Sequence, residues 1–416
     1  MPSAEFDHRT QRQLERLQST LNRAFRSVPF HQDRLKRNGI HPQQVETIAD
    51  LADMPFMTRR HLGENYPYGL FAVPLRDIVR IHTAPGTTLN PSVSGYTAHD
   101  LRQWTAMVAE SLAAAGVGNE DILQISLDPG LNDWGRDYKL GAEALGASVI
   151  PNSLLSIEKQ LMVLRDYRTT TLVTTPAYAA QIADHVRDLR IAPDRLALST
   201  LILVGEPVPG ERRRHLEDSL GVTTWLHYGL SEVPGPALAY ECRQHEGLHV
   251  HDEHFLVEII DPDTGRWVGP GTEGELVLTS LTTRAMPLIR FRTGDRVRRL
   301  EGPCACGNPT ERVAWLTGRT DDLMVLRGVK IDRAQVLAQI TSALAFAPDL
   351  YRVFVNTETN RRFLEVWIGV DDRIFSDEIK MLEKRMVDIG QRLYECLGVP
   401  VTVRLKERDT FDAIEA

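Results

Sequence analysis

The chain has 416 residues, of which 42% are hydrophobic and 25% charged, and its formal net charge is −8. The length and the apolar content predict two or three domains, one of them with a large core. An acidic chain without a block of Lys and Arg excludes a nucleic-acid-binding protein, because neutralising phosphates needs clustered positive charge. We therefore expect a small-molecule substrate as the partner.

The N-terminus and the apolar runs indicate a cytoplasmic protein without a membrane partner. The first seven residues lack the basic and apolar segments of a signal peptide. No run reaches the roughly 18 apolar residues that cross a bilayer. Four cysteines in a chain of this length do not predict a disulfide scaffold. A homodimer is a further expectation.

The first half predicts a layered α/β domain. Apolar residues recur at three- and four-residue steps and indicate an amphipathic helix over residues 9–28, through Leu14, Leu17, Leu21, Ala24 and Val28. The polar run Arg59-Arg60-His61 is typical of a solvated turn. Between residues 100 and 205 helical patterns alternate with short apolar runs, which favours a sheet covered by helices.

The pattern of predicted elements changes twice in the second half of the chain. Residues 255–260 and 275–279 flank the turn 261–265 and predict hairpins, so we expect the sheet to become antiparallel there. After Asp321, the order of elements is β-α-β-β-α-β, with Asp332 as a helix cap, and suggests a ferredoxin-like α+β domain. The predicted domains are therefore residues 1–320 and 321–416.

Four polar stretches occur in an order and at separations that carry a family resemblance. They are Thr83-Ala84-Pro85-Gly86-Thr87-Thr88, His227-Tyr228-Gly229-Leu230-Ser231-Glu232, Arg292-Thr293-Gly294-Asp295 and Gly318-Arg319-Thr320-Asp321-Asp322. Together they resemble the adenylate-forming superfamily, and in particular the phenylacetate-coenzyme A ligases. The likeness runs from Pro55-Phe56-Met57-Thr58 through Gly141–Gly146 to Gly328, which is most of the chain.

The resemblance implies an AMP-forming ligase that uses ATP and Mg²⁺, with coenzyme A as a possible acceptor. Glu232 would bind Mg²⁺, since one carboxylate plus substrate phosphates usually holds this ion. Asp295 would accept hydrogen bonds from the ribose hydroxyls, and Asp321 would be the hinge of a mobile C-terminal lid domain. Thr87 and Thr88 would bind the phosphates, and Arg319 would lie near the ribose or the phosphates. The adenine would lie beside Tyr228, Gly229, Gly205, Glu206 and Pro207.

Two departures from the family pattern stand out. The loop Ser-Ser-Gly-Thr-Thr-Gly-Lys-Pro of the family reads Ala84-Pro85-Gly86-Thr87-Thr88-Leu89-Asn90-Pro91 here, so we expect weaker phosphate binding. The family carries a catalytic lysine in a loop after the last strand. In this chain Lys406 is too close to that strand, and no lysine follows it. Losing one such charge typically costs about 10²–10³ in rate.

The cysteines suggest a structural zinc site. Cys242, His249, Cys304 and Cys306 supply three thiolates and one imidazole, a closed tetrahedral set that would staple the β-rich region. Some relatives of the phenylacetate ligases bear a zinc at these positions. His254 is the alternative nitrogen ligand, and buried thiols without a metal are the alternative to the site itself.

The segment before Gly141 is the candidate acyl pocket. Trp134 and Tyr138 could stack on an aryl ring, and Arg136 and Lys139 could receive a small anion. A solvated helix start is the alternative. Three functions follow: adenylation of a small, aromatic carboxylate with transfer to coenzyme A or an amine; an ATP-dependent diazotase of secondary metabolism that activates nitrite for an aryl amine; or a degenerate nucleotide-binding subunit.

Overall fold

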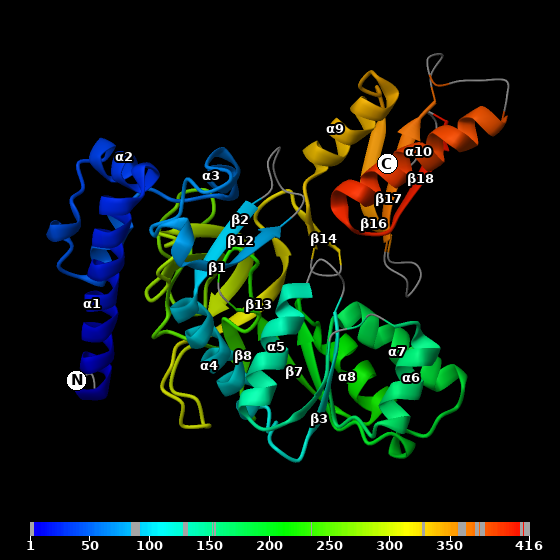
Figure 1. Ribbon diagram of the computed structural model, residues 1–416, viewed down its shortest axis with the longest axis horizontal. Helices are drawn as coiled ribbons and strands as arrows, with labels where there is room; N and C mark the ends of the chain where they lie inside the picture. The colour runs from blue at the N-terminus through cyan, green and yellow to red at the C-terminus, as the bar shows by residue number, and fades with distance from the viewer. Residues whose placement is uncertain are drawn as a thin grey trace.

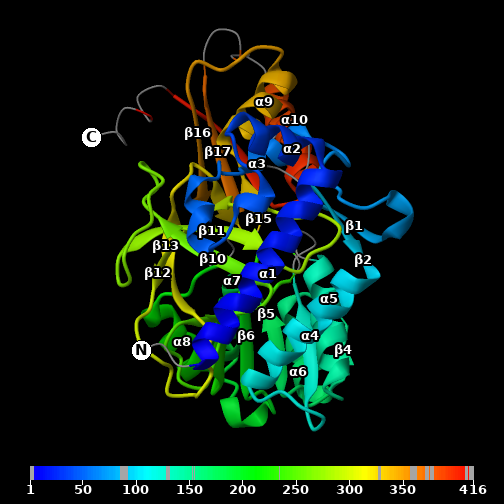
Figure 2. The ribbon, with the colours of Figure 1, turned by 90° about the vertical axis from the view of Figure 1, so that its left-hand side faces the viewer.

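The computed structural model describes residues 4–84, 92–127, 132–151, 153, 155–233, 235–326, 329–356, 363–370, 374, 379–407 and 411. Helix α1 (Ala4–Ser27) crosses one face of the body and is followed by α2 (Pro29–Arg37) (Figure 2). Its apolar stripe of Leu17, Leu21 and Ala24 packs on Leu256 and Ile289 of the body. The amphipathic helix expected from the sequence is thus confirmed.

The body is built on one sheet of eleven strands. Its parallel part comprises, in spatial order, β4 (Ser148–Ile150), β3 (Ile122–Ser126), β5 (Thr171–Thr174), β6 (Thr200–Val204) and β7 (Thr223–Tyr228). Its antiparallel part continues through β8 (Ala239–Glu241), β9 (Leu248–Val250), β13 (Arg312–Arg319), β12 (Phe291–Arg299), β11 (Glu273–Ser280) and β10 (Phe255–Ile260). The change to antiparallel pairing predicted near residue 255 is therefore present, and it begins earlier, at β8.

Alternating residues of the parallel strands serve two cores, because successive side chains point to opposite faces of a sheet. Val173, Ile202 and Val204 belong to the main cluster, which includes residues of α4 (Ala98–Ala114) and α5 (Asn132–Ala144). Leu172 and Leu201 pack instead with α6 (Ile157–Asp166), α7 (Pro176–Asp188) and α8 (Gly210–Leu220). The helix layers are seen in Figure 1.

Shorter elements complete the body. They are α3 (Arg59–Glu64), the antiparallel hairpin β1 (Ile78–Ala84) and β2 (Ser92–Thr97), and the 3₁₀ turns Pro42–Gln44, Ile48–Asp53, Leu75–Asp77 and Pro193–Arg195. Within the described ranges, no helix is long and apolar enough to span a membrane.

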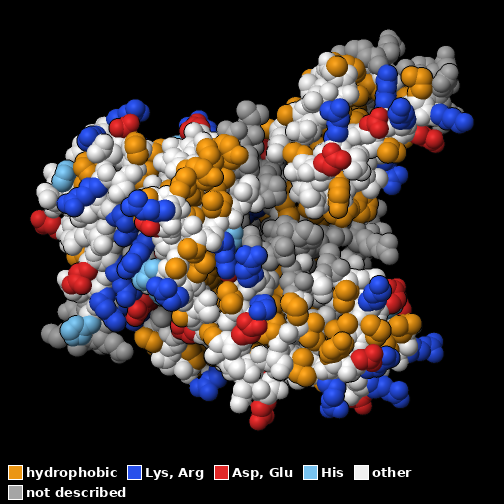
Figure 3. Space-filling view, in the orientation of Figure 1, with side chains coloured by type: hydrophobic (Ala, Val, Ile, Leu, Met, Phe, Trp, Pro, Cys, Tyr) orange, Lys and Arg blue, Asp and Glu red, His pale blue; other side chains and the backbone are white. Residues whose placement is uncertain are grey.

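The C-terminal domain is a small α+β unit that projects from one corner of the body (Figure 3). It contains β14 (Met324–Leu326), β15 (Val329–Ile331), α9 (Arg333–Leu344), β16 (Tyr351–Asn356), β17 (Phe363–Gly369), α10 (Ile379–Leu397) and β18 (Val401–Lys406). As expected, Asp332 caps α9, accepting a 2.8 Å hydrogen bond from the Ala334 amide. The sheet itself has three strands, β16-β17-β18, because β14 pairs with the adjacent β15 and does not join it.

Candidate functional site

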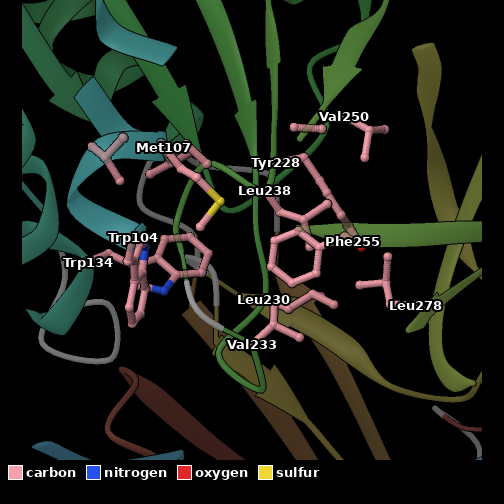
Figure 4. Packing of buried hydrophobic residues seen from close by; sticks show 14 of the residues in the cluster. Trp104, Met107, Trp134, Tyr228, Leu230, Val233, Leu238, Val250, Phe255 and Leu278 are labelled. Carbon is pink, nitrogen blue, oxygen red and sulfur yellow. The ribbon is translucent and has the colours of Figure 1, made fainter. Parts of the chain in front are cut away.

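The loop after β7 occupies the point where the sheet changes direction. Strand β7 pairs in parallel with β6 and antiparallel with β8, and open sheets bind ligands beyond the carboxyl ends of strands at such switch points. A Cβ on Gly229 would lie 2.6 Å from the Gly235 carbonyl oxygen, so only glycine fits there. Leu230 and Val233 are buried in the main cluster (Figure 4) and anchor Glu232 between them.

Tyr228, Asp295 and Arg319 form one buried network. The Tyr228 hydroxyl donates to Oδ2 of Asp295 at 2.8 Å, and Nη1 of Arg319 donates to the other oxygen of that carboxylate. Arg319 also makes two bonds to Asp321, of 2.6 and 2.7 Å. Burial, with the Asp295 charge, raises the pKa of Tyr228, so its hydroxyl stays protonated and remains a donor.

Gly294 allows this network to close. Its φ is +75°, and an added Cβ would lie 2.2 Å from Oδ2 of Asp321. A side chain there would therefore collide with the Arg319–Asp321 pair as well as strain the backbone. This gives the glycine of the Arg292–Asp295 stretch a steric reason.

Glu232 is a buried carboxylate between two cations. Its Oε1 accepts a 2.7 Å hydrogen bond from Nε of Arg59, and its Oε2 lies 3.6 Å from Nζ of Lys330. Desolvation would raise the pKa of Glu232, but the charges of Arg59 and Lys330 outweigh it and hold the pKa below its usual range. Glu232 is thus ionised and able to ligate a cation.

The assignment of Arg59 to a solvated turn is wrong. Met57 pairs with β12 through hydrogen bonds to Arg290 and Arg292, both of 2.8 Å, and this pairing carries the start of α3 over the sheet. Arg59 is consequently buried and donates to the Thr293 carbonyl at 2.9 Å. Its neighbour Arg60 is exposed, as expected.

Lys330 is a site residue that the sequence reasoning missed. On β15, Val329 and Ile331 point into the core of the C-terminal domain, and the alternation of a strand turns Lys330 the other way, toward Glu232. Desolvation, with the charge of Arg59, lowers the pKa of Lys330 to about 8. Apolar residues on both sides of a lysine in a strand were the signal that could have revealed it.

Of the remaining residues expected to bind the nucleotide, some lie beside the Tyr228 loop and others lie outside the described residues. Gly205, with φ +89°, and the buried Glu206 follow β6, whose Val204 pairs with His227 of β7, so residues 205–207 lie beside the start of the Tyr228 loop. Thr87 and Thr88, like the rest of their loop from residue 85 to 91, lie outside the described residues, as does Gly328.

The four candidate pocket residues are not brought together. Trp134 and Tyr138 are buried on α5, and the Tyr138 hydroxyl lies 2.8 Å from Nδ1 of His227. Arg136 is exposed, and Lys139 pairs with Glu143 at 2.7 Å. Two aromatic side chains therefore face inward, while two cationic ones face outward.

Three cysteines and one histidine converge beside β8, β9 and β13. The ligand atoms of Cys242, His249, Cys304 and Cys306 all lie within 4.8 Å of one another. Sγ of Cys242 and Sγ of Cys304 are 3.6 Å apart, close to the separation of about 3.8 Å expected on a zinc tetrahedron with Zn–S bonds of about 2.3 Å. The alternative ligand His254 bonds to Thr282 and is not part of the group.

Comparison with known proteins gives concordant matches. A family model described as "AMP-binding enzyme" matches residues 140–283. The phenylacetate-coenzyme A ligase of Pseudomonas putida is 35% identical, over 100% of this chain and 94% of its own length. The structure of 2-hydroxyisobutyryl-CoA ligase with 2-HIB-AMP and CoA, in its thioesterification state, shares the fold with a TM-score of 0.87, 23% identity and coverage of 98% of this chain and 87% of its own. The structure of that ligase in its postadenylation state with 2-HIB-AMP has a TM-score of 0.72 and 22% identity, and the match covers 100% of this chain and 92% of that one.

Proposed function

Because the chain belongs to the phenylacetate-coenzyme A ligase family of AMP-binding enzymes, we propose that it activates a small aromatic carboxylate as its acyl adenylate and passes the acyl group to coenzyme A. Membership makes the chain an AMP-forming ligase that uses ATP. The aromatic acid and the roles of individual residues are the content of the proposal.

The buried Tyr228–Asp295–Arg319 network beside Glu232 is the observation that carries it. The ribose hydroxyls would donate to Asp295, an acceptor that Tyr228 and Arg319 already hold in place. The Tyr228 ring would flank the base, with Gly205, Glu206 and Pro207, which follow the neighbouring strand β6, on its other side. Such fixed positions suit nucleotidyl transfer, which is catalysed mainly by positioning and charge stabilisation.

The two steps balance as follows. A carboxylate oxygen of the acid bonds to the α-phosphorus of ATP as the bond to pyrophosphate breaks. The sulfur of coenzyme A then bonds to the acyl carbon as the bond to AMP breaks, and the thiol proton goes to solvent. This chain orients the reactants and excludes water during both steps.

Magnesium fits at Glu232. The carboxylate is buried and ionised, and it would hold a hard cation whose other ligands are phosphate oxygens, which supply the remaining negative charge. The metal would neutralise phosphate charge. Arg59 would keep the carboxylate oriented toward the phosphates by its 2.7 Å bond.

The aromatic nature of the acid is supported by the inward side of α5. Trp134 and Tyr138 lie there, and both belong to a cluster that also contains Trp104. The exposed Arg136 and the paired Lys139 offer no basic pocket for nitrite. Among the described residues, nothing favours the diazotase or a non-catalytic subunit over a carboxylate-activating ligase.

We also propose one structural zinc at Cys242, His249, Cys304 and Cys306. The donor set and the 3.6 Å sulfur separation support it. Cys242 follows β8, His249 lies on β9, and the last two cysteines precede β13, so the metal would join three neighbouring strands of the sheet.

Substrate-dependent exchange of pyrophosphate into ATP tests the first step. We expect exchange with aryl and arylacetic acids and, when coenzyme A is added, release of AMP with the thioester. Exchange with aliphatic acids alone would overturn the aromatic assignment. AMP release that requires nitrite and an aryl amine would replace the ligase by the diazotase.

A further inference from the structure

Two buried cations with unused hydrogen-bond donors meet at Glu232. Nη2 of Arg59 and Nζ of Lys330 are both buried and have no hydrogen-bond partner in the described part of the chain. The nearest counter-ion of Lys330 is Glu232, whose Oε2 lies 3.6 Å away, longer than a hydrogen bond. Buried donors without a partner are costly, so a group that accepts from both would be bound favourably.

The position of Lys330 identifies the part of a nucleotide that would accept. Its ammonium interacts electrostatically with Glu232 and also with Asp295. In the proposed function the ribose lies at Asp295 and the metal-bound phosphates lie at Glu232. The phosphate attached directly to the ribose would run from Asp295 toward Glu232, and the Lys330 ammonium lies beside Glu232, 3.6 Å from its Oε2.

Lys330 reaches this place from the C-terminal domain. It sits on β15, after the expected hinge Asp321, whereas Arg59 belongs to α3 of the body. The chain overlaps the thioesterification state of 2-hydroxyisobutyryl-CoA ligase with a TM-score of 0.87 and its postadenylation state with 0.72. The orientation of the domain seen here therefore corresponds to the second step, in which AMP is the leaving group.

We propose that Arg59 and Lys330 form a binding site for the α-phosphate of AMP, assembled when the C-terminal domain takes this orientation. Glu232 pairs with both cations and offsets part of their mutual repulsion. As the acyl C–O bond breaks, negative charge grows on the AMP phosphate, and two fixed cationic donors stabilise it. The inference rests on the proposed function, because it takes the nucleotide to be AMP.

Calorimetric titration of the full chain with AMP and with adenosine, both without Mg²⁺, tests the site. We expect Lys330→Gln and Arg59→Gln each to weaken AMP binding about 10- to 100-fold, the effect of removing a charged hydrogen bond. Adenosine, which has no phosphate, should bind all proteins equally. Lys330→Arg should restore AMP binding, since it restores the charge and the donors.

Matched controls separate the site from general charge. Arg60→Gln removes an exposed cation next to Arg59, and Lys384→Gln removes an exposed one on the C-terminal domain; both should bind AMP as the parent does. Equal losses of AMP and adenosine affinity in Lys330→Gln would indicate a structural role and overturn the proposal. Affinity for inorganic pyrophosphate that depends on Lys330, with unchanged AMP affinity, would assign the site to the other product and also overturn it.

Kinetics distinguish this inference from the proposed function. In Lys330→Gln, pyrophosphate exchange should persist while thioester formation from the isolated acyl adenylate slows about tenfold or more. Unchanged thioester formation would reject the role of Lys330 and leave the ligase intact. A parent protein without exchange on any acid would reject the ligase, while the comparison of AMP with adenosine would still decide whether the phosphate site exists.

Discussion

The hydroxyl of Tyr228 donates a 2.8 Å hydrogen bond to Asp295, so the residue expected at the base and the residue expected at the ribose are one unit. Asp295 also accepts from Arg319, which donates to Asp321 as well. Changes at these positions should therefore alter folding and nucleotide affinity together.

Asp295→Asn should cost about 3 kcal/mol of unfolding free energy, because it removes one partner of a buried ion pair. Tyr228→Phe should cost about 1 kcal/mol, the value of one hydrogen bond. Chemical denaturation measures both. Of the two variants, Asp295→Asn should lose more of the stabilisation that added AMP gives, since one of the two carboxylate oxygens becomes an NH₂ donor and the charge is lost; full AMP stabilisation of that variant would contradict the assignment.

Glu232→Gln should remove the dependence of turnover on Mg²⁺ together with most of the turnover. The amide keeps the shape of the side chain but lacks the charge that a hard cation requires. A titration of pyrophosphate exchange against Mg²⁺ provides the measurement. Glu120→Gln, which alters an exposed acidic residue, serves as the control and should titrate like the parent. An unshifted Mg²⁺ dependence in Glu232→Gln would remove this residue from the metal site.

Gly294→Ala should destabilise the protein more than Gly302→Ala. Both glycines have similar positive φ values, +75° and +74°, so the backbone strain of about 1 kcal/mol is common to the pair. Only at Gly294 would the new Cβ meet Asp321 and Arg319, whereas no atom lies within 4 Å at Gly302. Melting temperatures give the difference, and equal losses would show that the Arg319–Asp321 pair moves aside freely.

Cys304→Ser should lose the metal and several degrees of melting temperature. Elemental analysis of the parent should find about one zinc per chain, because four protein ligands close a tetrahedral shell. Cys396→Ser alters a cysteine of the C-terminal domain outside the cluster and should retain the zinc. A metal-free parent, or a Cys304→Ser variant with the stability of the parent, would contradict the structural zinc site.

His31 should make the protein less stable as the pH falls. Burial, then the charge of Arg34, lowers the pKa of His31 from near 6.5 to about 3. Between these values the unfolded chain binds a proton that the folded chain does not, so stability is complete above about pH 6.5 and falls by about 1.4 kcal/mol per pH unit below it. His31→Gln can keep the hydrogen bond to the Pro287 carbonyl. Between about pH 6 and pH 4 the unfolding of this variant should take up one proton fewer than that of the parent, so its unfolding free energy should fall less steeply as the pH falls. An identical pH slope would exclude His31 as a contributor.

The sequence predicted those parts of the site that local patterns determine. Tyr228, Glu232, Asp295 and Arg319 were identified from short stretches, and the structure brings them together. Arg59 was misassigned because its burial depends on a pairing between Met57 and β12, more than 230 residues apart, which no local pattern reveals. The C-terminal sheet has three strands and not the four expected from the β-α-β-β-α-β order for a similar reason. The order of elements does not determine which strand β14 pairs with, and it pairs with β15.

The dispersion of the site along the chain has a consequence for synthesis. Its contacts join residues 59, 228–232, 293–295, 319–321 and 330. A polypeptide emerging from the ribosome can fold its early segments first, since domains form in order of translation. It acquires the full set of groups proposed to bind phosphate and sugar only after about four fifths of the message has been read, so a product released before that point would lack the proposed AMP site.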